Sequence, residues 1–159
     1  MNKKIFLIKF LLIFLIFLTD QISKYYIINV FKSQNEEIYL TSFLNFQLIW
    51  NEGIAFGLFS FSQSNLYNLI TLIIVMIIFF ILTLIIKSEG LERISLSMVF
   101  GGALGNLYDR IMYKAVPDFI DFHIRDLHWF IFNVADIFIT LGVIMLILLE
   151  LLKTKKYNE

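Results

Sequence analysis

Long apolar segments are the feature that most constrains the fold of this chain. Four of them, at about 5–27, 66–86, 94–112 and 131–150, are long enough to cross a bilayer. The hydrocarbon core is about 30 Å thick, and a helix needs about 20 residues to span it. Hydrophobic residues make up 59% of the 159 positions, more than soluble domains usually carry. We therefore expect one integral membrane domain over 1–159, an all-α bundle of four transmembrane helices.

Basic residues indicate the orientation of these helices. Lysines and arginines lie before the first segment, between the second and third, and after the fourth. The positive-inside rule then predicts that both termini lie in the cytoplasm and that the loops at about 28–65 and 113–130 face outward. Lys3 and Lys4 would also suit a cleaved signal sequence. Because no small-x-small cleavage site follows them, we expect an uncleaved first helix.

The first outer loop has the pattern of a β-structure rather than of a linker. Its 36–50 stretch is rich in aliphatic and aromatic residues, and Phe46, Leu48 and Trp50 alternate as in a strand. We expect a small extracytoplasmic β-sheet at the membrane surface, which makes the fold α+β overall. Trp50, Phe56 and Phe59 add to the aromatic content of this loop, which suits a position at the membrane interface.

Composition excludes several kinds of chemistry. The formal net charge is zero, so nothing favours a nucleic-acid partner. Cysteine is absent, which excludes disulfides and thiolate nucleophiles, and two histidines are too few for most zinc sites. We predict neither a metal nor a cofactor. Any chemistry must therefore come from carboxylates, hydroxyls, amides, lysine or arginine, and a serine nucleophile is disfavoured because no histidine or lysine lies at a persuasive spacing from a serine.

Three acidic residues inside the spans share one depth. With a rise of about 1.5 Å per residue, Asp20, Asp109 and Asp136 each lie roughly 21–22 Å from the cytoplasmic end of their helix. Ionisable groups in a membrane are costly and mark functional sites by default. Asp136 is the hardest of the three to explain structurally, because no basic residue lies near it on its helix and we place it about a turn and a half inside.

The other charged residues have simpler interpretations. Asp20 and Lys24 are spaced as an ion pair, and Asp109 with Arg110 suits an interfacial anchor. Gly101 and Gly105 have the small-residue spacing of close helix packing. In the second outer loop we expect Asp121, Arg125 and Asp126 to be solvated charges. We expect His123 and His128 to be interfacial or packed rather than catalytic.

Intramembrane acids alone leave two functions open. A protease and a small ion-coupled transporter are equally compatible with them. A transporter predicts acids spread across the whole bilayer, whereas here the cytoplasmic halves of the spans hold almost none. A structural scaffold is a third reading, and it predicts that the acids are dispensable.

Five sequence blocks resemble the bacterial lipoprotein signal peptidases, also called signal peptidase II. They are DQISK at 20–24, NEGIAFG at 51–57, GGALGNLYDR at 101–110, VPDF at 116–119 and FNVAD at 132–136. Their order and the four-span layout match that family over nearly the whole chain. Each block alone is weak evidence, whereas five in order are specific.

The resemblance implies an aspartyl endopeptidase of the bacterial cytoplasmic membrane, with its active site near the outer leaflet. Its substrate would be a diacylglyceryl-modified prolipoprotein, which it would cut before the lipidated cysteine. Membrane lipid would surround it, and a globomycin-type cyclic peptide would inhibit it. The catalytic pair maps onto Asp118 and Asp136. The supporting positions map onto Asp20, Lys24, Asn51, Gly53, Gly105, Asn106, Asp109, Arg110, Asn133 and Ala135. Two residues depart from the family pattern, Pro117 before Asp118 and Phe130 before the last block, and they bear on local geometry.

Overall fold

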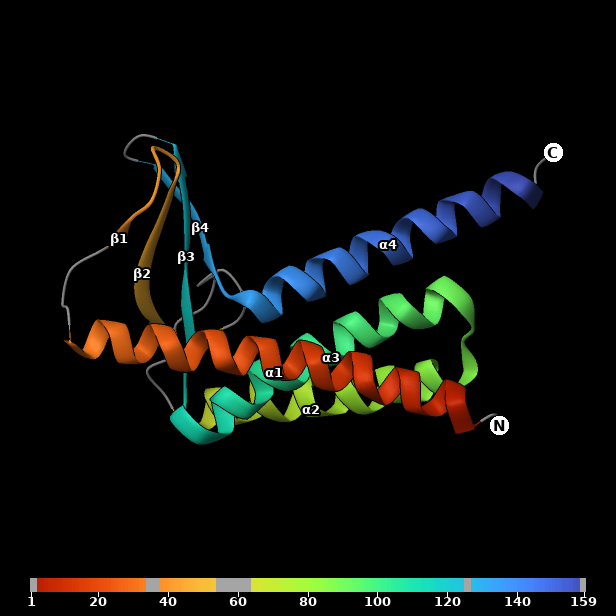
Figure 1. The fold of residues 1–159 in the computed structure, drawn as a ribbon. Helices are drawn as coiled ribbons and strands as arrows, with labels where there is room; N and C mark the ends of the chain where they lie inside the picture. The colour runs from red at the N-terminus through yellow and green to blue at the C-terminus, as the bar shows by residue number, and fades with distance from the viewer. Residues whose placement is uncertain (1–2, 34–37, 54–63, 125–126, 158–159) are drawn as a thin grey trace.

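A computed structural model describes residues 3–33, 38–53, 64–124 and 127–157. The chain is mostly helical, with one small sheet at one end of the helices (Figure 1). The elements run in the order α1 Lys3–Ser33, β1 Ile38–Tyr39, β2 Leu44–Asn51, α2 Ser64–Lys87, α3 Gly90–Tyr113, β3 Val116–Ile124, β4 Leu127–Phe132 and α4 Val134–Tyr157. Both termini lie at the end of the helices away from the sheet.

Three helices in the described part of the chain are long and apolar enough to cross a membrane. They contain Phe10–Ser33 of α1, Tyr67–Lys87 of α2 and Val134–Lys153 of α4. The prediction of four transmembrane helices is therefore supported only in part. α3 covers the third predicted segment, but Asn106, Asp109 and Arg110 lower its mean hydropathy.

The start of the last helix corrects the sequence prediction. The fourth apolar segment was expected to begin at 131, but Ile131 and Phe132 belong to β4 and α4 begins at Val134. Asp136 therefore lies in the first turn of α4 and not a turn and a half inside it. The apolar run hides this boundary because a strand and a helix that are both packed on apolar surroundings look alike in sequence.

α3 is the central helix, packed against α1, α2 and α4. Its glycines bring two neighbours close. A Cβ on Gly101 would lie 3.1 Å from Ile16 of α1, and a Cβ on Gly105 would run into the carboxyl group of Asp20. A Cβ on Gly102 would lie 2.5 Å from the carbonyl oxygen of Ala135 in α4. The predicted close packing at Gly101 and Gly105 is confirmed.

The sheet joins both of the loops that were predicted to face outward. It is antiparallel with strand order β1-β2-β3-β4, so the predicted strand character of 36–50 is confirmed in β1 and β2. The sequence analysis missed β3 and β4, because the charges of the second loop suggested solvent exposure. That interpretation was wrong for Asp121, which is 0% exposed, whereas His123, at 8% exposure, is packed as expected. Residues 125 and 126, the side chain of His128, Phe56 and Phe59 lie outside what the structure describes.

Candidate active site

The sheet carries the first candidate aspartate. Asp118 is the third residue of β3, pairs with Ile49 of β2 and is 4% exposed. Two amide side chains hold its carboxyl group. Nδ2 of Asn51 donates to Oδ2 at 2.9 Å, and Nδ2 of Asn133 donates to Oδ1 at 2.6 Å. Both carboxyl oxygens are therefore oriented by neutral donors rather than by a cation.

Asp136 is held by the start of its own helix. Asn133 precedes α4, and its Oδ1 accepts from the backbone N–H of Asp136 at 3.1 Å. In return Oδ2 of Asp136 accepts from the backbone N–H of Asn133 at 3.2 Å. This reciprocal pair is the capping-box arrangement, which satisfies two helix-start donors and fixes the side chain of the third helical residue. Nδ2 of Asn106 completes the set by donating to Oδ1 of Asp136 at 2.8 Å.

Asn133 links the two aspartates. Its side-chain oxygen accepts a hydrogen bond from the backbone N–H of Asp136, and its side-chain nitrogen donates one to the carboxyl group of Asp118. Asn133 itself is fully buried, at 0% exposure. An amide is suited to this position because it carries one acceptor and one donor on a planar group. The two candidate carboxyl groups thus meet at a single rigid residue.

A buried ion cluster lies directly behind Asn106. The ammonium group of Lys24 donates to Asp20 at 2.8 Å, to Asp109 at 2.6 Å and to Oδ1 of Asn106 at 2.9 Å. All three ammonium hydrogens are used. Because Lys24 can only donate, it binds the oxygen of the Asn106 amide and leaves the nitrogen facing Asp136. Gln21 adds donors to Asp20 at 3.1 Å and to Asp109 at 3.2 Å.

The same cluster also holds the first turn of α4. The second oxygen of Asp20 accepts from the backbone N–H of Ala135 at 2.9 Å. Helix starts leave such N–H groups without partners, and a carboxylate there is stabilised by the helix dipole. Asp20 fits against α3 only because Gly105 has no side chain. Ala135, at 0% exposure, leaves no room for a larger residue.

Arg110 organises the segment that follows β2. Its Nη2 donates to the carbonyl oxygen of Gly53 at 3.0 Å, and its Nη1 donates to the carbonyl oxygen of Asn106 at 3.2 Å. The N–H of Gly53 donates to Oδ1 of Asn51 at 2.9 Å, so the amide nitrogen of Asn51 is the end that faces Asp118. A chain of hydrogen bonds therefore runs from Arg110 through Gly53 and Asn51 to Asp118. A second chain runs from Lys24 through Asn106 to Asp136.

Burial sets the proton affinity of Asp118. Removal from water, the larger cause, and the nearby Asp136 carboxyl together raise the pKa of the Asp118 carboxyl group from 3.8 to about 6. Hydrogen bonds from Asn51 and Asn133 act in the opposite direction. Each of two neighbouring buried carboxyl groups disfavours ionisation of the other, which favours sharing of one proton between them.

Two grooves reach Asp136 from either side of α4. One, of about 260 Å³, lies between α2, α3 and α4, and Asn106, Arg110 and Asp136 line its polar end. The other, of about 370 Å³, lies between β4 and α4 and is lined by Phe130, Phe132 and Asp136 among others. Apart from Asn106, Arg110, Asp136 and Thr140, the lining residues are apolar, which suits an apolar substrate segment.

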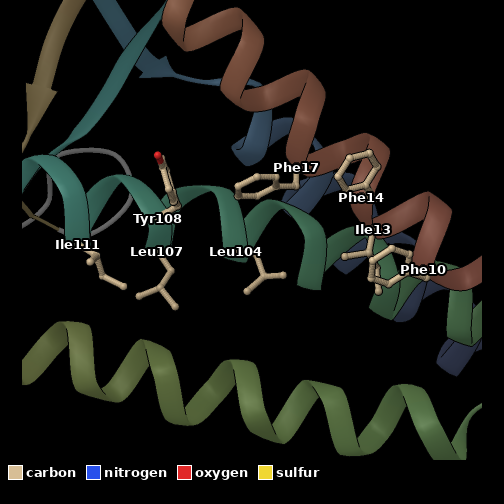
Figure 2. Close-up of a pocket in the computed structure, with 8 residues that line it drawn as sticks. All are labelled: Phe10, Ile13, Phe14, Phe17, Leu104, Leu107, Tyr108 and Ile111. Atoms are coloured by element: carbon tan, nitrogen blue, oxygen red, sulfur yellow. The ribbon is translucent and has the colours of Figure 1, made fainter.

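A third groove has no such chemistry. Figure 2 shows it between α1 and α3, where Phe10, Phe14 and Phe17 face the groove from one side and Leu104 and Leu107 line the other. Its volume is about 360 Å³ and no acidic residue lines it. We therefore locate the candidate active site at Asp118 and Asp136, and not at this groove.

All twelve predicted site residues lie in this one connected region, but some roles differ from those inferred from sequence. Asp109 and Arg110 were interpreted as an interfacial anchor, yet they are 1% and 6% exposed. Sequence reasoning did not assign roles to Gln21, whose place beside Asp20 in the first block was a signal, or to Tyr67. The hydroxyl of Tyr67 donates to the carbonyl oxygen of Arg110 at 3.2 Å. Nothing in the sequence around Tyr67 indicated this contact, because the two residues lie far apart in the chain.

Comparisons with known proteins agree on one family. The family model described as signal peptidase (SPase) II matches residues 12–152. The lipoprotein signal peptidase of Pelagibacter ubique (strain HTCC1062) is 49% identical over 99% of this chain and 96% of its own length. That of Anaplasma phagocytophilum (strain HZ) is 42% identical over 87% of this chain and 88% of its own. A solved structure, a bacterial membrane enzyme, matches 95% of this chain and 91% of its own with a TM-score of 0.74 and 30% identity.

Proposed function

Because this chain belongs to the signal peptidase II family, we propose that it is an aspartic endopeptidase that removes signal peptides from diacylglyceryl-modified prolipoproteins. It cuts the peptide bond before the lipidated cysteine, and Asp118 and Asp136 are its catalytic pair. The observation that carries this assignment is the meeting of both carboxyl groups at Asn133 in a buried site. The transporter alternative finds no support in the family match.

The reaction follows from one shared proton. The ionised carboxyl group takes a proton from a water molecule, whose oxygen attacks the scissile carbonyl carbon. The protonated carboxyl group hydrogen-bonds the carbonyl oxygen and stabilises the charge that develops there. As the C–N bond breaks, a proton passes to the departing amine of the cysteine. Because the two groups are coupled, the pair titrates as a unit, and neither aspartate alone is the base.

The neighbouring residues position the pair. Asn51 and Asn133 hold Asp118, and Asn106 and the capping box hold Asp136. Lys24, Asp20 and Asp109 fix Asn106 and the start of α4 from behind, while Arg110 fixes Gly53 and through it Asn51. Such pre-organised contacts reduce the reorganisation that the reaction itself would otherwise require.

All four helices, α3 included, cross the bacterial cytoplasmic membrane, with the approximate boundaries 5–27, 66–86, 94–112 and 134–150. The polar residues of α3 are tolerated because α1, α2 and α4 surround it. Both termini lie in the cytoplasm and the sheet lies on the outer surface. The position of both termini away from the sheet supports this orientation.

The substrate reaches the site sideways from the lipid. A lipid-modified signal peptide is itself a membrane segment, and the grooves on either side of α4 open beside Asp136. An active site near the outer leaflet matches a cut site close to the membrane surface. A globomycin-type cyclic peptide binds the same site and blocks processing, which is tested by titrating the purified enzyme with globomycin.

The deciding experiment compares three variants of the purified enzyme. Asp118→Asn and Asp136→Asn each lose at least about a thousandfold in processing of lipidated prolipoprotein, as removal of a proton-transferring group implies. Glu150→Gln, on the exposed side of α4, retains activity. Unlipidated prolipoprotein is the substrate control and stays uncut. Normal processing by both Asn variants would overturn the assignment.

A further inference from the structure

Thr140 lies one helical turn after Asp136 on the same face of α4. Its side chain is exposed in the protein and lines both grooves that reach Asp136. Neither the catalytic pair nor the residues that position it use this side chain. Thr140 therefore stands on the path of any substrate that enters either groove.

Among the helical serine and threonine side chains that the structure describes, only that of Thr140 has no hydrogen-bond partner. Serine and threonine in a helix usually donate to the carbonyl oxygen one turn back. Thr19, Thr71, Thr83, Ser95 and Ser97 all do so, at 2.7 to 2.9 Å. Thr140 makes no hydrogen bond within the part of the chain that the structure describes.

An unpaired hydroxyl is unfavourable in this position. Hydrocarbon offers no hydrogen-bond partner, so a donor that faces it keeps a desolvation cost. A peptide in the groove offers a partner. To place a peptide bond between two carboxyl groups, the substrate must unwind from its helix near the cut. Unwinding frees backbone carbonyl oxygens in an apolar medium, where each of them needs a donor.

We propose that Thr140 is a substrate-binding residue whose hydroxyl donates a hydrogen bond to a backbone carbonyl of the signal peptide. The inference rests on the proposed function and on α4 running from the outer surface to the cytoplasm. Thr140 then lies about 5–6 Å from Asp136 toward the cytoplasm, the side from which the signal peptide arrives. An extended chain rises about 3.3 Å per residue. The carbonyl is therefore that of the residue roughly two positions before the cut.

Two substitutions separate the hydroxyl from the shape of the side chain. Thr140→Val keeps the branched shape, and because no hydrogen bond is lost in the free protein, its thermal unfolding midpoint stays at the wild-type value. Its kcat/KM on a lipidated prolipoprotein peptide falls between about 2-fold and about 12-fold, the range for one hydrogen bond. Thr140→Ser restores activity to within about twofold of wild type. The matched control is Thr83→Val on α2, which removes a hydroxyl bonded to its own helix and leaves kcat/KM unchanged.

A modified substrate tests the partner atom. In a peptide whose carbonyl two positions before the cut is a thioamide, a weaker acceptor, wild-type kcat/KM falls by a factor similar to that of Thr140→Val. The two changes together cause no further loss, because they remove the same bond. Full activity of Thr140→Val would overturn the proposal. So would a kcat/KM of Thr140→Val on the thioamide peptide that falls by the product of the two separate factors. These outcomes are distinct from failure of the catalytic assignment, which the Asn variants at Asp118 and Asp136 report independently.

Discussion

Nδ2 of Asn133 lies 2.6 Å from Oδ1 of Asp118, the shorter of the two amide hydrogen bonds that this carboxyl group accepts. Asn133 is also the residue that caps α4 with its side-chain oxygen. One amide therefore joins the strand that carries one of the proposed catalytic carboxyl groups to the helix that carries the other. Because the oxygen and the nitrogen of this amide have different partners, mutation can test their two roles separately.

Asn133→Ser is expected to separate helix capping from orientation of Asp118. Serine is a good cap, so the thermal unfolding midpoint in detergent stays near that of the wild type, whereas Asn133→Ala loses about 1 kcal/mol of stability. Neither variant has the donor that reaches Asp118. Both should therefore lose about a hundredfold in kcat, the scale expected when a catalytic group is misplaced. An active serine variant would show that the contact with Asp118 is dispensable.

Loss of the Asp136 charge is expected to lower the pKa of Asp118. Burial, the larger cause of the raised value, remains in Asp136→Asn, so the pKa should fall below about 6 but stay above 3.8. The carbonyl stretching band of protonated Asp118, isolated as the infrared difference between Asp136→Asn and the double variant with Asp118→Asn, reports the titration midpoint. A midpoint unchanged from that of the wild-type enzyme would mean that the two carboxyl groups do not interact.

Stability should depend on pH through Asp118 with a defined sign. Its folded pKa lies above its unfolded value, so the folded state binds the proton more tightly and loses stability as pH rises from about 3.8 to about 6. Well above pH 6 the full loss in the free energy of unfolding, about 3 kcal/mol at this pKa difference, is reached. Asp118→Asn removes this titration, so thermal unfolding scans between pH 4 and pH 7 should show a smaller decline for the variant. An identical decline in both proteins would contradict the pKa assignment.

Lys24→Met should impair both the fold and the site. The change leaves Asp20 and Asp109 as buried carboxyl groups without a cation, which costs about 3–5 kcal/mol. Adding Asp20→Asn and Asp109→Asn removes those charges and should recover part of the thermal stability. Activity should remain low in the triple variant, because the ammonium donor that fixes the oxygen end of the Asn106 amide is still missing. Recovery of full activity together with stability would mean that Lys24 serves only to balance charge.

Two glycines on one face of α3 should respond differently to alanine. A methyl group at Gly105 would run into the carboxyl group of Asp20, which holds both Lys24 and the backbone of Ala135. Gly105→Ala should therefore lower the unfolding midpoint and abolish processing. At Gly101 the new methyl group would meet Ile16 at 3.1 Å and the backbone oxygen of Ile13 at 3.2 Å, contacts that a shift of α1 by a few tenths of an ångström relieves. Comparable defects in the two variants would refute the specific role of Gly105.

The amino-acid sequence by itself determined the helices and the inventory of the site. Apolar length predicted where helices lie, because burial in lipid depends on composition over about 20 residues and not on distant partners. Helical rise alone placed Asp20, Asp109 and Asp136 in one layer, and the structure joins them through Lys24 and Asn106. The five blocks indicated the family, which the comparisons confirmed.

Only the tertiary structure decided how these residues act. The predicted second outer loop became two strands because β2 pairs with β3 and β3 pairs with β4. That pairing buried Asp118, and it also buried Asp121, whose charge had suggested solvent. The boundary between β4 and α4 moved Asp136 to a helix start, where a backbone N–H can hold it. Sequence spacing measures position along one element, whereas hydrogen bonds between elements depend on how chain segments far apart pack together.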